Sequence, residues 1–230
     1  MKVKLFLLLL LYSSANLNAS AIDDSVAYSM GIQLAISLQK NGILNKFEQN
    51  ASFLEAFNDM KNSASKLTLN DMERVLTTYF TNVFEKDKAE NEVAGKNFLE
   101  NNAKNPGVVV LPSGLQYKIV KQGDGKIKPR LTDNIEVHYR GTLVDGTVFD
   151  SSYESGQPMT IQLNDVIEGW KEGLQHITEG GKILLYIPAS LAYGDKVMAG
   201  GKIGPNSTLI FEIELFKITP PETTETEETK

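Results

Sequence analysis

The segment Val166-Ile167-Glu168-Gly169-Trp170 contains the only tryptophan of the 230-residue chain. An indole ring buries a large apolar area but needs a partner for its single N–H group. The residues that follow, Lys171-Glu172-Gly173, favour the start of a helix. The pattern is typical of a core tryptophan, and it also fits a ring that faces a half-solvated cavity. The other aromatic residues of the chain decide between these interpretations.

Short strand-like segments surround this helix in the C-terminal half. They are rich in β-branched and aromatic residues and are separated by turns that contain glycine. Only residues 170–176 have a helical pattern in this half. The sequence therefore predicts an α+β domain, in which a curved antiparallel sheet wraps around one short helix. The predicted strands are residues 116–121, 134–140, 159–163, 182–187 and 208–218.

Alternation within the strands indicates which side chains face the helix. In Ile135-Glu136-Val137-His138-Tyr139 the odd positions are apolar, so Tyr139 points inward. Phe211 occupies the inner face of the last strand by the same pattern. Phe149 and Tyr193 are expected where loops meet the sheet. The residues that can line one cavity are therefore Tyr139, Phe149, Trp170, Tyr193 and Phe211, with Asp150 as the adjacent carboxylate.

Five motifs follow one another through this half of the chain. They are Tyr139-Arg140-Gly141-Thr142, Asp145-Gly146-Thr147-Val148-Phe149-Asp150-Ser151-Ser152, Val166-Ile167-Glu168-Gly169-Trp170, Ala192-Tyr193-Gly194 and Leu209-Ile210-Phe211-Glu212. In this order and spacing they resemble the FKBP-type peptidyl-prolyl isomerases. Pro106-Gly107-Val108-Val109-Val110-Leu111 and the helix before it resemble the Mip (macrophage infectivity potentiator) branch of exported bacterial members. The resemblance implies an N-terminal dimerisation module, a long connecting helix and a C-terminal isomerase domain.

The resemblance also implies that the protein speeds rotation about X-Pro bonds. This reaction would involve no covalent intermediate, no metal and no cofactor. Trp170 would form the floor under the prolyl ring. The Tyr193 hydroxyl and the backbone N–H of Ile167 would donate to substrate carbonyls, and Asp150 would supply a polar edge without donating a proton. The expected catalytic residues are Tyr139, Phe149, Asp150, Trp170, Tyr193 and Phe211. The expected substrate-binding residues are Met159, Val166, Ile167 and Ile203, with Met159 standing where many members have a larger aromatic side chain.

The N-terminus has the three parts of a secretory signal peptide at residues 1–21. Met1-Lys2-Val3-Lys4 precedes an apolar run at residues 5–11, and Ala19-Ser20-Ala21 ends the segment. The run is too short to span a bilayer, although an N-terminal anchor remains an alternative. We therefore expect an exported protein without a transmembrane segment in its mature chain. The resemblance implies the periplasm, outer membrane or surface of a Gram-negative bacterium.

Helical periodicity dominates the region between the signal peptide and the isomerase domain. We expect a helical dimerisation module at residues 22–68, a connecting helix at 69–105, the isomerase domain at 106–219 and a disordered acidic tail at 220–230. Residues 85–92 are polar on all sides, which is typical of a helix that bridges solvent. The helices before residue 85 are too few to enclose their aromatic side chains in a monomer. A homodimer is therefore predicted, with a monomeric three-helix cap as the alternative.

Composition excludes several other functions. The net charge of −6 argues against nucleic acid as a partner, and the absence of cysteine removes disulfides and thiolate catalysis. A hydrolase would need a base, and only His138, which is expected to point outward, and His176 could serve. The expected partners are proline-containing polypeptides and macrolides of the FK506/rapamycin type. The alternatives are a non-catalytic dimeric holdase chaperone, a proline-peptide binding module and, with less support, a surface adhesin.

Overall fold

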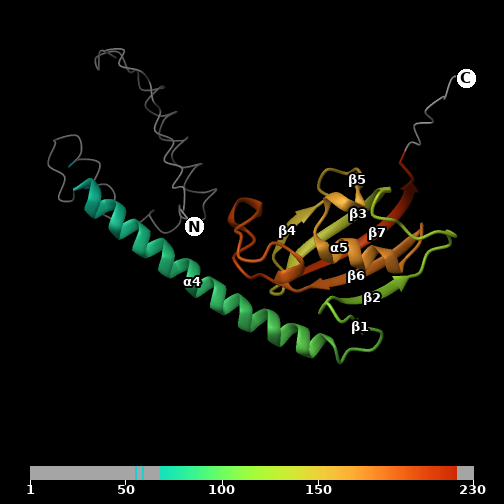
Figure 1. Ribbon diagram of the computed structural model, residues 1–230, viewed down its shortest axis with the longest axis horizontal. Helices are drawn as coiled ribbons and strands as arrows, with labels where there is room; N and C mark the ends of the chain where they lie inside the picture. Colours follow the sequence, from blue (N-terminus) through green and yellow to red (C-terminus); the bar gives the residue numbers. More distant parts are fainter. Residues whose placement is uncertain (1–54, 56–58, 60–67, 222–230) are drawn as a thin grey trace, which may run out of the picture. The chain divides into compact units, whose positions relative to one another are not determined.

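The structure is a computed structural model that describes residues 55, 59 and 68–221 (Figure 1). The predicted signal peptide, nearly all of the predicted module at residues 22–68 and residues 222–230 of the predicted tail lie outside the described residues. All the elements described below belong to one compact unit of the chain, which begins at residue 54.

The long helix α4 spans Leu69–Asn102. Thr68 caps its first turn, because its side-chain oxygen accepts a hydrogen bond of 3.1 Å from the backbone N–H of Asp71. The sequence predicted a connecting helix at residues 69–105, and the structure ends it three residues earlier. Pro106 disfavours helical geometry in the residue before it, so the helix stops ahead of that position. None of the helices in the described part of the chain is long and apolar enough to cross a bilayer.

One antiparallel sheet of seven strands forms the described part of the C-terminal half (Figure 1). The strand order is β1-β2-β6-β7-β3-β4, and β5 pairs with β3 off this path. The predicted α+β architecture is therefore confirmed. The strands are β1 Val109–Val110, β2 Gln116–Lys121, β3 Asn134–Leu143, β4 Val148–Ser151, β5 Met159–Gln162, β6 Gly181–Ile187 and β7 Leu209–Thr219.

Most strand boundaries agree with the sequence prediction to within three residues, but β1 and β4 were not predicted. β1 has only two residues, both exposed, so it carries no periodic signal. β4 has four residues and pairs with β3 through a register shift between Gly141 and Thr142. Phe149 was expected where a loop meets the sheet, and it is the second residue of β4. The strand itself was not predicted because four residues show no clear alternation.

The short helix α5, Glu168–Gly173, lies over one face of the sheet and continues into a 3-10 turn, Leu174–His176 (Figure 1). Two glycines four positions apart allow its close approach to β6. A Cβ atom added to Gly169 would overlap Ile187, and one added to Gly173 would overlap Leu185. This close packing brings Trp170 down onto the sheet. Further 3-10 turns span Leu163–Asp165, Ala189–Leu191 and Ala199–Gly201.

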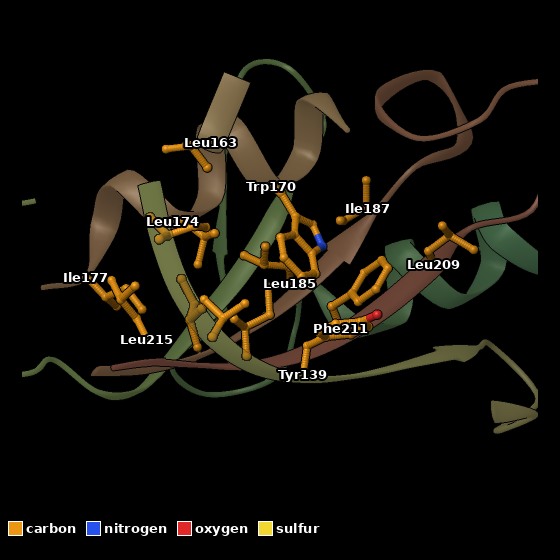
Figure 2. Close-up of a cluster of buried hydrophobic side chains, with 14 of the residues drawn as sticks. Tyr139, Leu163, Trp170, Leu174, Ile177, Leu185, Ile187, Leu209, Phe211 and Leu215 are labelled. Atoms are coloured by element: carbon orange, nitrogen blue, oxygen red, sulfur yellow. The ribbon is translucent and has the colours of Figure 1, made fainter. Parts of the chain in front are cut away.

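The core lies between α5 and the inner face of the sheet (Figure 2). Burial alternates along β3, β6 and β7, as the period of two in a strand requires. Leu185 and Ile213 are fully buried on the sheet, and Leu174 is fully buried opposite them. The predicted inward orientation of Tyr139 and Phe211 agrees with this alternation.

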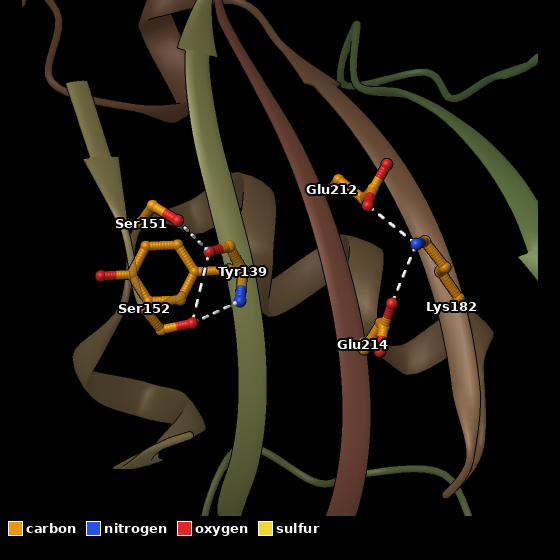
Figure 3. Close-up of polar contacts among 6 residues, drawn as sticks. All are labelled: Tyr139, Ser151, Ser152, Lys182, Glu212 and Glu214. Carbon is orange, nitrogen blue, oxygen red and sulfur yellow. Dashed lines mark hydrogen bonds and ion pairs between the residues drawn. The ribbon is translucent and has the colours of Figure 1, made fainter. Parts of the chain in front are cut away.

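The outer face of the sheet is polar. Lys182 of β6 pairs with two glutamates of β7, at 2.8 Å from Glu212 and 2.9 Å from Glu214 (Figure 3). His138 also lies on this face, where its ring stacks on Tyr153 with a centroid distance of 4.5 Å. These contacts lie on the side of the sheet opposite α5. The ion pairs hold the neighbouring strands β6 and β7 together, and none of these contacts involves a side chain of the inner face.

Candidate functional site

Four aromatic rings from four different elements meet above the centre of the sheet. Trp170 of α5 lies edge-on to Phe211 of β7, with ring centroids 5.1 Å apart and an interplanar angle of 90°. Tyr139 of β3 lies 5.3 Å from Trp170, and Phe149 of β4 lies 5.4 Å from Phe211. Figure 2 shows Trp170 reaching down to Tyr139 and Phe211. Each edge-to-face pair contributes about 0.5–1.5 kcal/mol beyond its area burial.

Gly141 of β3 makes room for two of these rings. A Cβ atom at this position would lie 2.5 Å from the Phe149 ring and 2.9 Å from the Phe211 ring. Glycine inside a strand costs about 0.5–1 kcal/mol relative to alanine. The Arg140-Gly141-Thr142 motif therefore accepts a local loss of stability that lets the aromatic rings pack together.

Asp150 lies at the exposed edge of this cluster. Its Oδ2 atom accepts a hydrogen bond of 2.7 Å from the Tyr139 hydroxyl. Burial raises the pKa of Tyr139, and the hydrogen bond to Asp150 raises it further. Burial also raises the pKa of Tyr193, with a smaller effect from the Asp150 charge. Both hydroxyl groups therefore keep their protons at neutral pH and can donate hydrogen bonds.

Ser152 fixes the backbone of Tyr139 and was not identified from the sequence. The backbone N–H of Tyr139 donates to Ser152 Oγ at 2.8 Å, and the backbone N–H of Ser152 donates to the Tyr139 carbonyl at 3.1 Å. Ser151 Oγ donates to the same carbonyl at a longer distance of 3.4 Å (Figure 3). Ser152 is buried, although serine is a mostly exposed residue type. Its position at the end of the Phe149-Asp150-Ser151-Ser152 motif was the available signal.

The predicted substrate-binding residues belong to, or pack against, the hydrophobic core that contains these four rings. Ile203 is buried within it, whereas Met159, Val166 and Ile167 are half-buried at its border. Tyr193, a predicted catalytic residue, is half-buried there too. All ten predicted site residues therefore lie in this hydrophobic core, against it or, for Asp150, in hydrogen-bond contact with Tyr139 of the core.

The surroundings of Trp170 differ from one expectation. Its ring is only 3% exposed, so it does not face a half-solvated space. Its indole N–H is buried and has no hydrogen-bond partner among the described residues. An unpaired buried donor of this kind costs about 1–3 kcal/mol. Trp170 is therefore a packed core residue with one hydrogen-bond donor left unsatisfied by the described residues.

A cleft of about 610 Å³ lies away from this cluster. Its lining comes from α4, including Asn91 and Leu99, and from the isomerase half, including Gln116, Pro188 and Thr208. None of the ten predicted site residues lines it. The cleft therefore shares no lining residue with the predicted site, which belongs to the aromatic cluster and its surroundings.

Comparison with known families defines the class of protein. The family described as FKBP-type peptidyl-prolyl cis-trans isomerase matches residues 125–216. The domain described as amino terminal to FKBP-type peptidyl-prolyl isomerase matches residues 23–119. The chain belongs to the FKBP-type peptidyl-prolyl cis-trans isomerases, and the predicted resemblance is confirmed.

Relatives extend the match along most of the chain. The outer membrane protein MIP of Legionella longbeachae is 41% identical over 202 residues, which cover 85% of this chain and 85% of that protein. The isomerase FkpA of Escherichia coli is 40% identical over 213 residues, covering 86% of this chain and 76% of that protein. The crystal structure of FkpA from Escherichia coli aligns with a TM-score of 0.61 at 38% identity, over 85% of this chain and 94% of that one. The protein is therefore a peptidyl-prolyl cis-trans isomerase.

Proposed function

We propose that the isomerase reaction takes place at the aromatic cluster, on X-Pro bonds of folding proteins. Trp170 supports the prolyl ring from below, and Tyr139, Phe149 and Phe211 surround it. The Tyr193 hydroxyl and the backbone N–H of Ile167 donate hydrogen bonds to substrate carbonyls. Met159, Val166 and Ile203 extend the apolar contact on either side of the proline.

The chemistry needs no nucleophile. Rotation about an X-Pro bond crosses a barrier of about 20 kcal/mol, because resonance gives the C–N bond partial double-bond character. The twisted imide has lost this resonance, and its carbonyl is less polar. An apolar surface that excludes water therefore favours the twisted form over the planar one. In this role Asp150 orients the Tyr139 hydroxyl and sets the electrostatic field at the edge of the site, without transferring a proton.

The arrangement around Tyr139 carries this proposal. Tyr139 packs edge-on against Trp170 at 5.3 Å and donates to Asp150 at 2.7 Å. One side chain therefore joins the apolar floor to the exposed carboxylate. This combination suits a prolyl ring on one side and a carbonyl group that loses polarity on the other.

A proline-limited refolding assay tests the proposed function. The full chain should accelerate the slow refolding phase when it is present at about one hundredth of the substrate concentration, as a catalyst does. A macrolide of the FK506/rapamycin type should abolish the acceleration by occupying the aromatic cluster. Acceleration that requires stoichiometric protein would instead identify a holdase or a proline-peptide binding module.

Dimerisation through the N-terminal region is the second part of the proposal. The first half of α4 exposes large apolar side chains, with Val75 51% and Tyr79 46% exposed and Leu76 beside them. Burying such side chains is worth about 1.5–3 kcal/mol each. A second copy of the chain that covers this face would provide that burial. Sedimentation should give the mass of a dimer, and a monomer at micromolar concentration would contradict this part.

Export and chaperone activity complete the proposal. The pattern of residues 1–21 supports an exported protein, and the name of the Legionella relative places that relative at the outer membrane. The proposed location is the periplasm or the outer membrane of a Gram-negative bacterium. Two isomerase domains held apart by paired helices could also hold unfolded chains, which is the chaperone activity proposed here. Cell fractionation tests the first point, and suppression of aggregation in the presence of a macrolide tests the second.

A further inference from the structure

A closed loop at residues 194–206 borders the proposed site. The backbone N–H of Asn206 donates to the Gly194 carbonyl at 2.8 Å and closes the base of this loop. Met198 and Ile203 exchange two backbone hydrogen bonds of 3.0 and 3.1 Å across it. The loop directly follows Tyr193 and contains Ile203. Its conformation therefore determines where two of the proposed substrate contacts lie.

Helix α4 contacts both ends of this 194–206 loop. Lys88 Nζ lies 2.6 Å from Asp195 Oδ2 at the start of the loop. Asn91 Nδ2 donates a hydrogen bond of 2.9 Å to the carbonyl of Pro205 at its end. Asp195 is two residues from Tyr193, and Pro205 is two residues from Ile203. The helix thus supports the loop next to each proposed substrate contact.

Gly95 allows the helix to come this close. It is buried, and a Cβ atom at its position would overlap Oγ1 of Thr208, just beyond the loop. Positions 88, 91 and 95 follow the three- and four-residue spacing of one helical face. The segment at residues 85–92 was predicted to bridge solvent. That expectation was wrong for Lys88 and Asn91, whose face of the helix packs on the isomerase domain.

The end of α4 is tied to the sheet independently of the loop. Gln116 of β2 donates to the carbonyl of Leu99 at 2.9 Å, and Asn102 donates to the Gln116 side-chain oxygen at 2.9 Å. Gln116 and Asn102 are both buried. Phe98 also packs against Tyr186 of β6 with a centroid distance of 5.9 Å. The helix is therefore a fixed support, against which the 194–206 loop can be held.

The two loop contacts differ in strength. The Lys88–Asp195 pair is solvent-exposed, with side chains 33% and 51% exposed, and such pairs contribute little. Asn91 is half-buried and Pro205 is buried, so a lost partner leaves a carbonyl with poor access to water. The Asn91–Pro205 hydrogen bond is therefore the contact that constrains the loop.

We propose that Asn91 is a positioning residue of the isomerase, which sets substrate affinity by holding the 194–206 loop. The inference rests on the proposed roles of Tyr193 and Ile203. These residues contact the parts of the substrate beside the rotating bond, so they bind the planar and twisted forms about equally. A loss of such uniform binding raises KM and leaves kcat unchanged. The contacts of Tyr139, Asp150 and Trp170 come from β3, β4 and α5, which stay in place.

The test compares Asn91→Asp with Asn97→Asp in the full chain. Asn91→Asp keeps the shape of the side chain but replaces the donor with a carboxylate that cannot donate. Asn97 is exposed on the same helix, so Asn97→Asp makes the same change of charge away from the loop. The substrate is a proline tetrapeptide, and kcat and KM are measured by NMR exchange. We expect KM to rise about three- to tenfold for Asn91→Asp, with kcat within about twofold of the wild type.

Two further variants separate positioning from general destabilisation. Asn91→Ala should raise KM to a similar extent, without the added charge, while the thermal unfolding midpoint stays close to that of Asn97→Asp. An unchanged KM in both Asn91 variants, or a fall in kcat that matches a loss of folded protein, would overturn the inference. Asp150→Leu is measured in parallel. If that variant is also fully active, the proposed site fails; if it is impaired while the Asn91 variants are unchanged, only the helix–loop inference fails.

Discussion

The hydroxyl of Tyr139 donates a 2.7 Å hydrogen bond to Oδ2 of Asp150, and this bond links a buried aromatic ring to an exposed carboxylate. The two residues come from β3 and β4, the strand pair whose register shifts at Gly141. Asp150 pairs with Gly141 just before this shift, and its exposed side chain lies at the edge of the aromatic cluster. The electrostatic role proposed for Asp150 depends on this bond.

Removing the carboxylate should slow catalysis with little effect on folding. Asp150→Leu should lower kcat/KM about tenfold, since a hydrogen bond to a charged group is worth about 1.5–3 kcal/mol and this one is partly in water. Tyr139→Phe should cause a similar loss. The double variant should be little worse than either single variant, because both remove the same bond. Additive losses in this cycle would show that the two side chains act separately.

Ser152 should matter for stability because of its bond to the Tyr139 backbone. Ser152→Ala leaves a buried N–H group without its 2.8 Å partner, which costs about 1–3 kcal/mol. Urea unfolding should show that loss, together with reduced activity as Tyr139 becomes less well held. Ser151→Ala is the matched control, since its contact to Tyr139 is 3.4 Å long. Equal losses in the two variants would contradict a special role for Ser152.

Gly95→Ala should destabilise the protein, although replacing a glycine inside a helix by alanine usually stabilises it. Alanine favours a helix over glycine by about 1 kcal/mol, so propensity alone predicts stabilisation. The new Cβ would overlap Thr208, and we therefore expect a lower thermal unfolding midpoint. Ala94→Gly at the adjacent exposed position measures the propensity effect in the same helix. A gain in stability for Gly95→Ala equal to the loss for Ala94→Gly would show that α4 does not need this close approach.

Stability and activity should change with pH only in the alkaline range. Burial raises the pKa of both Tyr139 and Tyr193 above the value of about 10 expected in the unfolded chain. Their contribution to stability is therefore full below about pH 10 and is lost as the pH rises through the folded pKa. Activity should stay constant from about pH 7 to about pH 10, and tyrosinate absorbance should show groups that titrate only as the protein unfolds. A fall in activity near pH 8 that follows tyrosine ionisation would contradict this expectation.

The sequence predicted side-chain orientation well where the signal was local. Alternation within each strand was enough to predict that Tyr139 of β3 and Phe211 of β7 point inward, because side-chain direction has a period of two. The unique Trp170 and the glycines around it were sufficient to place a helix over the sheet. Strand β4, which carries Phe149, was not predicted because it is short and joins β3 through a register shift, which depends on the partner strand.

Contacts between distant polar residues could not be predicted in this way. Asn91 and Pro205 are 114 positions apart, and a polar side chain on a polar helix produces no periodic pattern. The only sequence feature that indicated a packed face of the helix was the spacing of Lys88, Asn91 and Gly95. Ser152 was overlooked for a related reason, since its importance lies in a buried hydrogen bond and not in hydrophobicity.

The most direct test of the central claim follows Trp170 fluorescence and isomerase activity in one titration. Trp170 is the only tryptophan, so its emission reports on the aromatic cluster alone. A macrolide of the FK506/rapamycin type is added to the full chain, and both signals are measured at each concentration. If catalysis takes place over Trp170, the fraction of activity lost should equal the fraction of the fluorescence change at every point. Full activity at saturating fluorescence change, or full inhibition with unaltered emission, would contradict the account.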